Sequence, residues 1–139
     1  MGQYVVDIEL SDGAGGSAPF QITLEIEEAP NRNPEFATTL QTSHTIVKTN
    51  SAASWSYTLP ASTDLDTIDV VTVTATIPSS ASTFLTFDDT DKKLEISNLQ
   101  DEDNTAIPIG QYVVDIALDD GNGGSASYQI TLAIQEAPN

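Results

Sequence analysis

The sequence contains the same segment twice, and this repetition constrains the fold more than any other feature. Residues 2–31 and 110–139 are identical at 23 of 30 positions and are offset by 108 residues. Self-similarity at a fixed offset is the signature of a repeat architecture. We therefore expect the chain to hold the C-terminal hairpin of one incomplete repeat in residues 1–31, followed by one whole repeat in residues 32–139.

In each copy of the duplicated segment, large apolar side chains alternate with smaller or polar ones. In the second copy they are Tyr112, Val114, Ile116 and Leu118, and then Tyr128, Ile130, Leu132 and Ile134. A period of two is typical of a half-buried strand. Residues 119–124, between the two runs, read Asp-Asp-Gly-Asn-Gly-Gly and favour a turn. Each copy is therefore predicted to form a β-hairpin.

Five further short strands are predicted between the two copies, because β-branched residues dominate there and no window carries a helical apolar stripe. They cover residues 43–48, 54–59, 69–77, 84–87 and 93–97. Alternation within them gives a candidate core of Trp55, Tyr57, Leu59, Val71, Val73, Ala75, Leu85, Phe87, Leu94 and Ile96. About seven short strands in one repeat predict an all-β fold, an immunoglobulin-like antiparallel β-sandwich, with the first copy as an extra N-terminal β-hairpin.

The segment 28–36 joins the two repeats. It contains two prolines and two asparagines, which favour a stiff, extended chain outside any regular sheet. We interpret it as an interdomain linker.

Composition excludes several classes of function. The chain has 21 acidic and 4 basic residues, for a net charge of −17, which would repel nucleic acid and anionic lipid. There is no cysteine for disulfides or thiolate zinc sites, and no apolar run approaches the ~20 residues that span a bilayer. The only histidine, His44, has no Gly-x-Ser-x-Gly segment to work with, so we expect no enzyme activity.

Most of the acidic residues gather in predicted loops. In an immunoglobulin-like sandwich the loops around residues 64–66 and 119–120 lie at the same end, and the linker that carries Glu28, Asn31 and Asn33 arrives there too. Calcium takes six to eight oxygen ligands, so converging carboxylates are what a calcium site requires. The pattern predicts an interdomain calcium site, with a solvated set of acidic loops as the alternative.

The stretch from Trp55 through Ile134 resembles a dystroglycan-type cadherin-like domain and, more distantly, a cadherin repeat. The likeness covers about 100 residues, and its motifs are individually weak but occur in the right order. They are Asp64-Leu65-Asp66, Phe84-Leu85-Thr86-Phe87-Asp88, Gly110-Gln111-Tyr112-Val113-Val114, Ala117-Leu118-Asp119-Asp120-Gly121 and the junction Asn33-Pro34-Glu35-Phe36.

The resemblance implies a non-enzymatic, extracellular or cell-surface repeat with a structural and adhesive role, binding calcium at its junctions. By that resemblance the ligands of one site are Asp64, Asp66, Asp119, Glu28 and Asn31, and a second, C-terminal half-site has Asp101 and Glu102. Gln100, Pro30 and Arg32 depart from the family's pattern, and Arg32 would repel a cation. We therefore expect one or two ions, bound weakly, with dissociation constants on the order of 10⁻⁴–10⁻³ M.

The expected partners are neighbouring repeats of the same protein. The spare hairpin also predicts a homo-oligomer formed by hairpin exchange or edge pairing, through Tyr4, Val6, Ile8, Phe20, Ile22 and Ile26. Two other functions stay open at this point. One is a carbohydrate-binding module that takes a glycan, although alternation directs Trp55 and Tyr57 inward; the other is a non-adhesive spacer.

Overall fold

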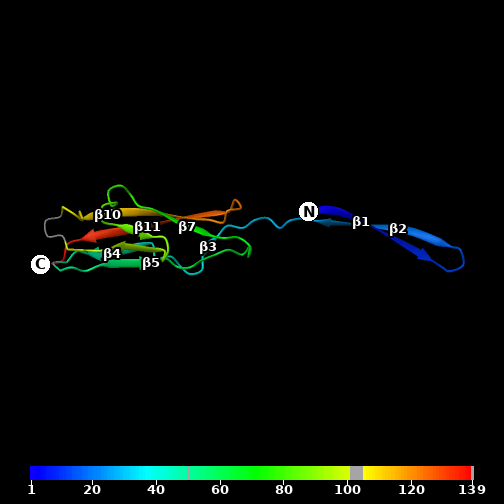
Figure 1. Ribbon diagram of the computed structural model, residues 1–139, viewed down its shortest axis with the longest axis horizontal. Helices are drawn as coiled ribbons and strands as arrows, with labels where there is room; N and C mark the ends of the chain where they lie inside the picture. Colours follow the sequence, from blue (N-terminus) through cyan, green and yellow to red (C-terminus); the bar gives the residue numbers. More distant parts are fainter. Residues whose placement is uncertain (50, 101–104, 139) are drawn as a thin grey trace. The chain divides into compact units, whose positions relative to one another are not determined.

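The computed structural model describes residues 1–49, 51–100 and 105–138. The chain divides into two compact units, Met1–Pro30 and Asn31–Asn139, and each is described by itself. The first unit contains β1 (Gly2–Ser11) and β2 (Ser17–Ile26) (Figure 1). The second contains β3 (Glu35–Phe36), β4 (Ser43–Val47), β5 (Trp55–Thr58), β6 (Ser62–Thr63), β7 (Thr72–Thr76), β8 (Thr86–Asp88), β9 (Lys93–Ile96), β10 (Gly110–Asp119) and β11 (Ser125–Gln135).

The strands of the second unit form a β-sandwich. One sheet has four strands in the order β4-β11-β10-β7, a second has three in the order β5-β9-β8, and a small third sheet pairs β3 with β6. Strand β4 pairs in parallel with β11, and the isolated bridge between Thr49 and Gln100 is also parallel; the other strand pairings described are antiparallel. The predicted all-β, immunoglobulin-type fold is confirmed, and these parallel pairings are its departure from an antiparallel sandwich. Over the described residues no helix is long and apolar enough to cross a membrane.

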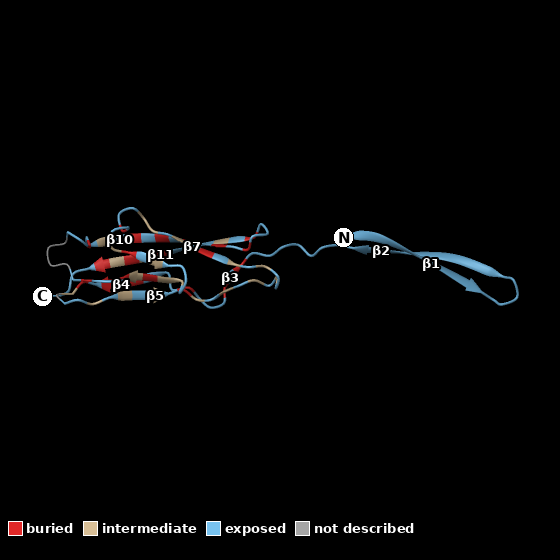
Figure 2. Ribbon diagram, viewed as in Figure 1, coloured by how far each residue is buried: buried red, intermediate tan, exposed pale blue. Residues whose placement is uncertain are grey.

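The core of the second unit is built from alternate side chains of its strands, as Figure 2 shows along β10. The predicted core residues Leu59, Val73, Leu85, Leu94 and Ile96 are at most 5% exposed. The other five candidates are partly buried and pack against the same cluster: Trp55, Tyr57, Val71, Ala75 and Phe87. The Tyr112 hydroxyl donates a hydrogen bond to the carbonyl of Pro108 at 2.7 Å, so this inward-facing ring has its polar end satisfied.

The linker prediction is wrong at its C-terminal end. Glu35 and Phe36 form β3 and pair with Thr63 and Ser62. The reason is burial: Phe36 is only 9% exposed and Pro34 is among the fully buried side chains, so apolar contact holds the end of this segment to the sandwich. The strand expected over residues 69–77 is also shorter, and begins at Thr72.

The first unit is a single hairpin with the same register as β10–β11. Its pairs run from Gly2↔Ile26 to Ser11↔Ser17, and those of the second hairpin run from Gly110↔Ile134 to Asp119↔Ser125. The two hairpins differ in burial, because every residue of β1 and β2 is exposed, as the uniform pale blue in Figure 2 shows.

Candidate metal site

Three carboxylates from two loops of the second unit come together at one point. Asp64 and Asp69 lie in the segment between β6 and β7, and Asp120 directly follows β10. One carboxylate oxygen from each lies within 4.8 Å of the others. Three negative charges at this separation repel one another, and a bound cation would relieve the repulsion.

Asp120 is the most enclosed member of the group, with 3% of its surface exposed. Its Oδ1 accepts hydrogen bonds from the backbone N–H groups of Asn122 (2.7 Å) and Gly124 (2.9 Å), and its Oδ2 accepts one from the Asn31 side-chain amide (2.8 Å). Burial by itself acts to raise the pKa of Asp120, but these hydrogen bonds together outweigh it and hold the pKa below its ordinary value. The carboxylate is therefore ionised and fixed in orientation at neutral pH.

Asp64 supplies the unsatisfied atom of the site. Its Oδ1 accepts a hydrogen bond from the backbone N–H of Asp66 at 2.8 Å. Its Oδ2 is buried and has no hydrogen-bond partner among the described residues. Leaving a buried carboxylate oxygen without a partner is costly, and metal coordination is one of the ways in which proteins compensate for it. In Asp69, Oδ1 accepts a hydrogen bond from the Asn122 side-chain amide.

The first residues of the second unit are attached to the loops that carry these acids. Asp66 pairs with Arg32: its Oδ2 accepts the Arg32 backbone N–H at 2.7 Å, and its Oδ1 lies 3.2 and 3.3 Å from two guanidinium nitrogens. Asn33 Oδ1 accepts the Ser125 backbone N–H at 3.2 Å. The Asp66 carboxylate is thus paired with the positive charge of Arg32.

Gly124 makes this close approach possible. A Cβ atom at this position would collide with Asp120 Oδ2 and lie 2.6 Å from the backbone oxygen of Arg32 and 3.0 Å from the side-chain nitrogen of Asn31. Only glycine leaves room for the linker and the Asp120 carboxylate to pass so close to the turn.

The structure brings together some of the predicted ligands and separates others. Asp64 belongs to the carboxylate group, and Asn31 is bound to it through Asp120. Asp66 lies against Arg32. Asp119 is outside the group, and its Oδ1 accepts the backbone N–H of Gly121 at 2.8 Å. As metal ligands, all four stay predictions.

The other predicted ligands are Glu28, Asp101 and Glu102. Glu28 belongs to the first unit, where it is exposed, and its role stays a prediction. The proposed second half-site, Asp101 and Glu102, lies outside the described residues.

Sequence reasoning did not select Asp69 and Asp120 as ligands, although comparing the two hairpins points to Asp120. Asp120 corresponds to Asp12 in the first copy, whereas Asp119 corresponds to Ser11. Asp12 has the same turn geometry, because its Oδ1 accepts the backbone N–H groups of Ala14 (2.8 Å) and Gly16 (2.9 Å). The acid present in both copies is the one that organises the turn.

The aromatic side chains around His44 form part of the packing and do not form an exposed platform. The His44 ring is 9% exposed, 4.3 Å from the Tyr57 ring and 5.4 Å from the Trp55 ring between centroids. Burial lowers the pKa of His44, a tendency only partly offset by the contact of Nε2 with the Gln41 carbonyl at 3.1 Å. The Tyr57 hydroxyl accepts the Gln41 backbone N–H at 3.0 Å. Trp55 and Tyr57 are thus partly buried against the core, in the direction that alternation predicted.

Comparisons with known proteins identify the fold. No protein-family model and no curated protein sequence matches the chain. Among solved structures it is similar to Drosophila N-cadherin EC1-4 (TM-score 0.55, 13% identity, 96% of this chain and 32% of that one) and to Drosophila N-cadherin EC1-3 (0.53, 13%, 97% and 44%). It is also similar to the third cadherin domain of human protocadherin 7, with a TM-score of 0.50, 16% identity, 81% of this chain and 93% of that one.

The identities are low, so the likeness concerns the fold alone. The chain spans a third to under a half of the two Drosophila structures. The narrower resemblance to the dystroglycan type stays a prediction. The sandwich, its strand order and these neighbours together show that this is a cadherin-like β-sandwich of immunoglobulin type.

Proposed function

We propose that this chain is part of an extracellular or cell-surface array of cadherin-like repeats, in which calcium bound near the junction between repeats stiffens the array for a structural and adhesive role. One observation carries the proposal. It is the group formed by Asp64, Asp69 and Asp120, in which a buried carboxylate oxygen of Asp64 has no partner among the described residues.

The chemistry of the group suits a hard divalent cation. All three side chains offer carboxylate oxygens, which calcium prefers, and no softer nitrogen or sulfur ligand belongs to the group. When bound, calcium would supply two positive charges to three negative ones. Asp66 is already paired with Arg32, so it does not add a fourth free carboxylate to the group. Three carboxylates favour a single, weakly bound ion. We expect a dissociation constant on the order of 10⁻⁴–10⁻³ M.

The position of the group supports a role at the junction. Asn31 hydrogen-bonds to Asp120, and Arg32 to Asp66, so the residues that lead into the sandwich are held by the same loops that carry the acids. An ion that orders these loops would also order the start of the linker. Glu28, three residues before Asn31, is our proposed contribution from the preceding repeat.

The array and its location rest on two further supports. The duplicated segment indicates that repeats of one kind follow each other in sequence, and the structural neighbours are ectodomain repeats of N-cadherin and a domain of a protocadherin. Adhesion by such an array would depend on many weak contacts acting together, each raising the effective concentration of the next.

Calorimetric titration of calcium into the full chain tests the proposal. The combined variant Asp64→Asn and Asp69→Asn removes two carboxylates of the group. The matched control, Asp7→Asn and Asp115→Asn, removes the same charge from two strand residues that each accept a hydrogen bond from a cross-strand glutamine. We expect saturable binding by the wild type and the control, and at least tenfold weaker binding by the first variant. Absence of binding heat in the wild type, or equal binding by both variants, would contradict the proposal.

A further inference from the structure

We propose that the β1–β2 hairpin is a docking element whose partner is a second copy of this chain: it can take the place of β10–β11 in the sandwich of that copy. This inference does not depend on calcium. It follows from the contrast between two hairpins of nearly the same sequence, one exposed and the other buried in a core.

The apolar face of the first hairpin has the side chains that fill the core of the second unit. Eight positions form this face, and seven of them are identical in the two hairpins; the exception is Phe20 in place of Tyr128. In the first hairpin the eight are 38–59% exposed: Tyr4, Val6, Ile8, Leu10, Phe20, Ile22, Leu24 and Ile26. Their seven identical counterparts in β10–β11 are 0–8% exposed. The registers of the two hairpins also agree, so both present these side chains in the same arrangement.

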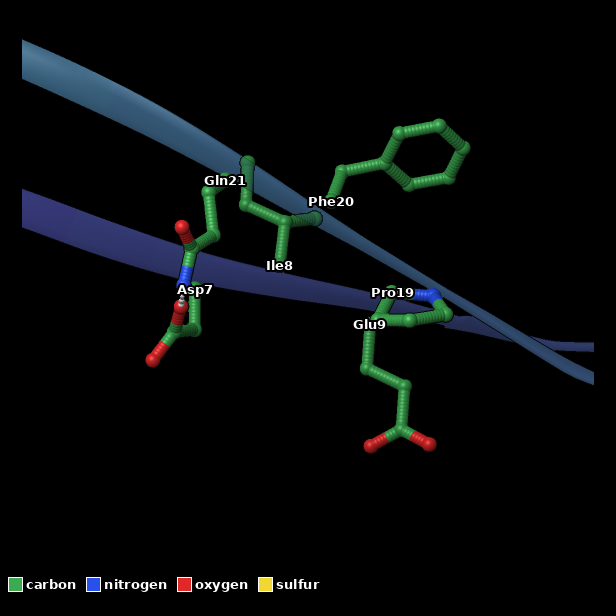
Figure 3. Close-up of a pocket in the computed structure, with 6 residues that line it drawn as sticks. All are labelled: Asp7, Ile8, Glu9, Pro19, Phe20 and Gln21. Carbon is green, nitrogen blue, oxygen red and sulfur yellow. Dashed lines mark hydrogen bonds between the residues drawn. The ribbon is translucent and has the colours of Figure 1, made fainter.

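The other six differences between the hairpins leave this face intact. They place Glu9, Ser11, Ala14, Pro19, Glu25 and Glu27 at the turn or on the opposite face. Figure 3 shows the division: the Phe20 ring lies on one side of the ribbon, and the carboxylates of Asp7 and Glu9 lie on the other. The six residues drawn there come from both faces of a two-stranded ribbon, so they do not enclose a separate ligand.

Pro19 is compatible with docking. It replaces Ser127 of β11, and strand β4 pairs with β11 only over Thr131–Gln135. In the docked state the hairpin would pair with β4 through the residues that correspond to Thr131–Gln135. Position 19 lies outside that stretch, so the missing N–H group of Pro19 does not cost a hydrogen bond to β4. Two of the other changes, Glu25 for Ala133 and Glu9 for Ala117, add charge to the outer face, where it discourages unspecific edge pairing.

The linker disfavours entry of the hairpin into the sandwich of its own chain. To replace β11, Ile26 would have to occupy the position of Ile134, nine residues and about 30 Å along the strand from Ser125. Asn33 is bonded to Ser125 and Asn31 to Asp120, at the opposite end of that strand. The five residues from Ile26 to Asn31 span at most ~18 Å. Entry within the same chain would therefore require these linker contacts to break, whereas the sandwich of another copy can accept the hairpin without that change.

Docking of this kind is head-to-tail. The hairpin of one copy enters the next copy, whose own hairpin can enter a third, so the assembly grows unless its geometry closes it into a reciprocal dimer or a ring. In the native chain β10–β11 is tethered to its own sandwich and has the higher effective concentration there. Docking by a second copy therefore becomes the dominant state when the tethered hairpin is disabled.

Matched charge insertions in the full chain test this inference. The variant Ile116→Asp plus Ile130→Asp disables β10–β11, and Ile8→Asp plus Ile22→Asp places the same changes at the corresponding positions of β1–β2. A third variant carries all four substitutions. Folding is followed by the near-ultraviolet circular dichroism of Trp55, the only tryptophan, and mass by light scattering at several protein concentrations.

We expect the Ile116/Ile130 variant to be folded and to form assemblies that grow with concentration. The Ile8/Ile22 variant should be folded and no larger than the wild type, and the fourfold variant should be unfolded. If the Ile116/Ile130 variant is as unfolded as the fourfold variant at every concentration, the spare hairpin does not dock. If it is folded and monomeric, the sandwich does not need a hairpin from a second copy. Either result would overturn the inference.

Discussion

The duplicated hairpin allows one core substitution to be compared with its own control in the same molecule. Ile130 has no exposed surface and lies opposite Val114 in the ladder, at the centre of the core, whereas Ile22, its counterpart, is 48% exposed. Replacing Ile130 with alanine removes three carbon groups, worth ~2.4 kcal/mol at about 0.8 kcal/mol each, and leaves a cavity. We expect a total loss of about 3–4 kcal/mol in the unfolding free energy of the sandwich.

At roughly 4 °C per kcal/mol for a unit of this size, Ile130→Ala should lower the melting temperature by ~12–16 °C. The substitution Ile22→Ala should change it by less than ~2 °C, because exposed sites outside the core contribute within about 0.5 kcal/mol. The assay is thermal unfolding followed by Trp55 fluorescence, since Trp55 packs against the core of the second unit. The reasoning holds that β10–β11 fills the core of this sandwich and that β1–β2 does not. Equal shifts in melting temperature for the two variants would refute it.

Three further predictions concern the loops and His44. Gly124→Ala should lower the melting temperature of the sandwich by several degrees, because the new Cβ collides with Asp120, whereas Gly16→Ala in the first hairpin should leave the Trp55 transition unchanged. Arg32→Ala should cost less than ~1 kcal/mol, as for other exposed ion pairs, yet strengthen calcium binding several-fold in calorimetry by releasing Asp66; unchanged or weaker binding would contradict this. Burial lowers the pKa of His44 from its ordinary value of 6.5, so as the pH falls the unfolded chain binds a proton at this residue before the folded chain does. The contribution of neutral His44 to the stability of the fold is therefore complete above pH 6.5. It is lost as the pH falls from 6.5 to the lower pKa of the folded state. Melting at pH 7.5 and 5.0 should show this loss in the wild type and a smaller one in His44→Phe.

The parts of the fold that follow a strict period could be predicted from the sequence. Alternation in residues 111–118 and 128–134 identified which side chains of β10 and β11 are buried, because the side chains of a strand point alternately to its two faces. Strands β3 and β6 have two residues each, too few for a period to be visible. They exist because Phe36 and Pro34 are buried, which is a property of the folded sandwich.

The candidate site was predictable as a region but not residue by residue. The grouping of acids in loops that share one end of the sandwich indicated where carboxylates would meet, and Asp64 is among those that do. Which acids point inward depends on turn hydrogen bonds and on Arg32. The turn of Asp120 directs its carboxylate toward Asn31, and the guanidinium holds Asp66 aside. Sequence spacing alone does not specify either contact.

The most direct test of the central proposal is the melting temperature of the full chain in calcium and in chelator, for the wild type and for Asp64→Asn. With a dissociation constant on the order of 10⁻⁴–10⁻³ M, 10 mM calcium should stabilise the sandwich by about 1.4–2.7 kcal/mol. The expected rise in melting temperature is ~6–11 °C for the wild type and less than ~2 °C for Asp64→Asn. A wild-type melting temperature that is the same in calcium and in chelator would contradict the proposal that this group of carboxylates binds calcium.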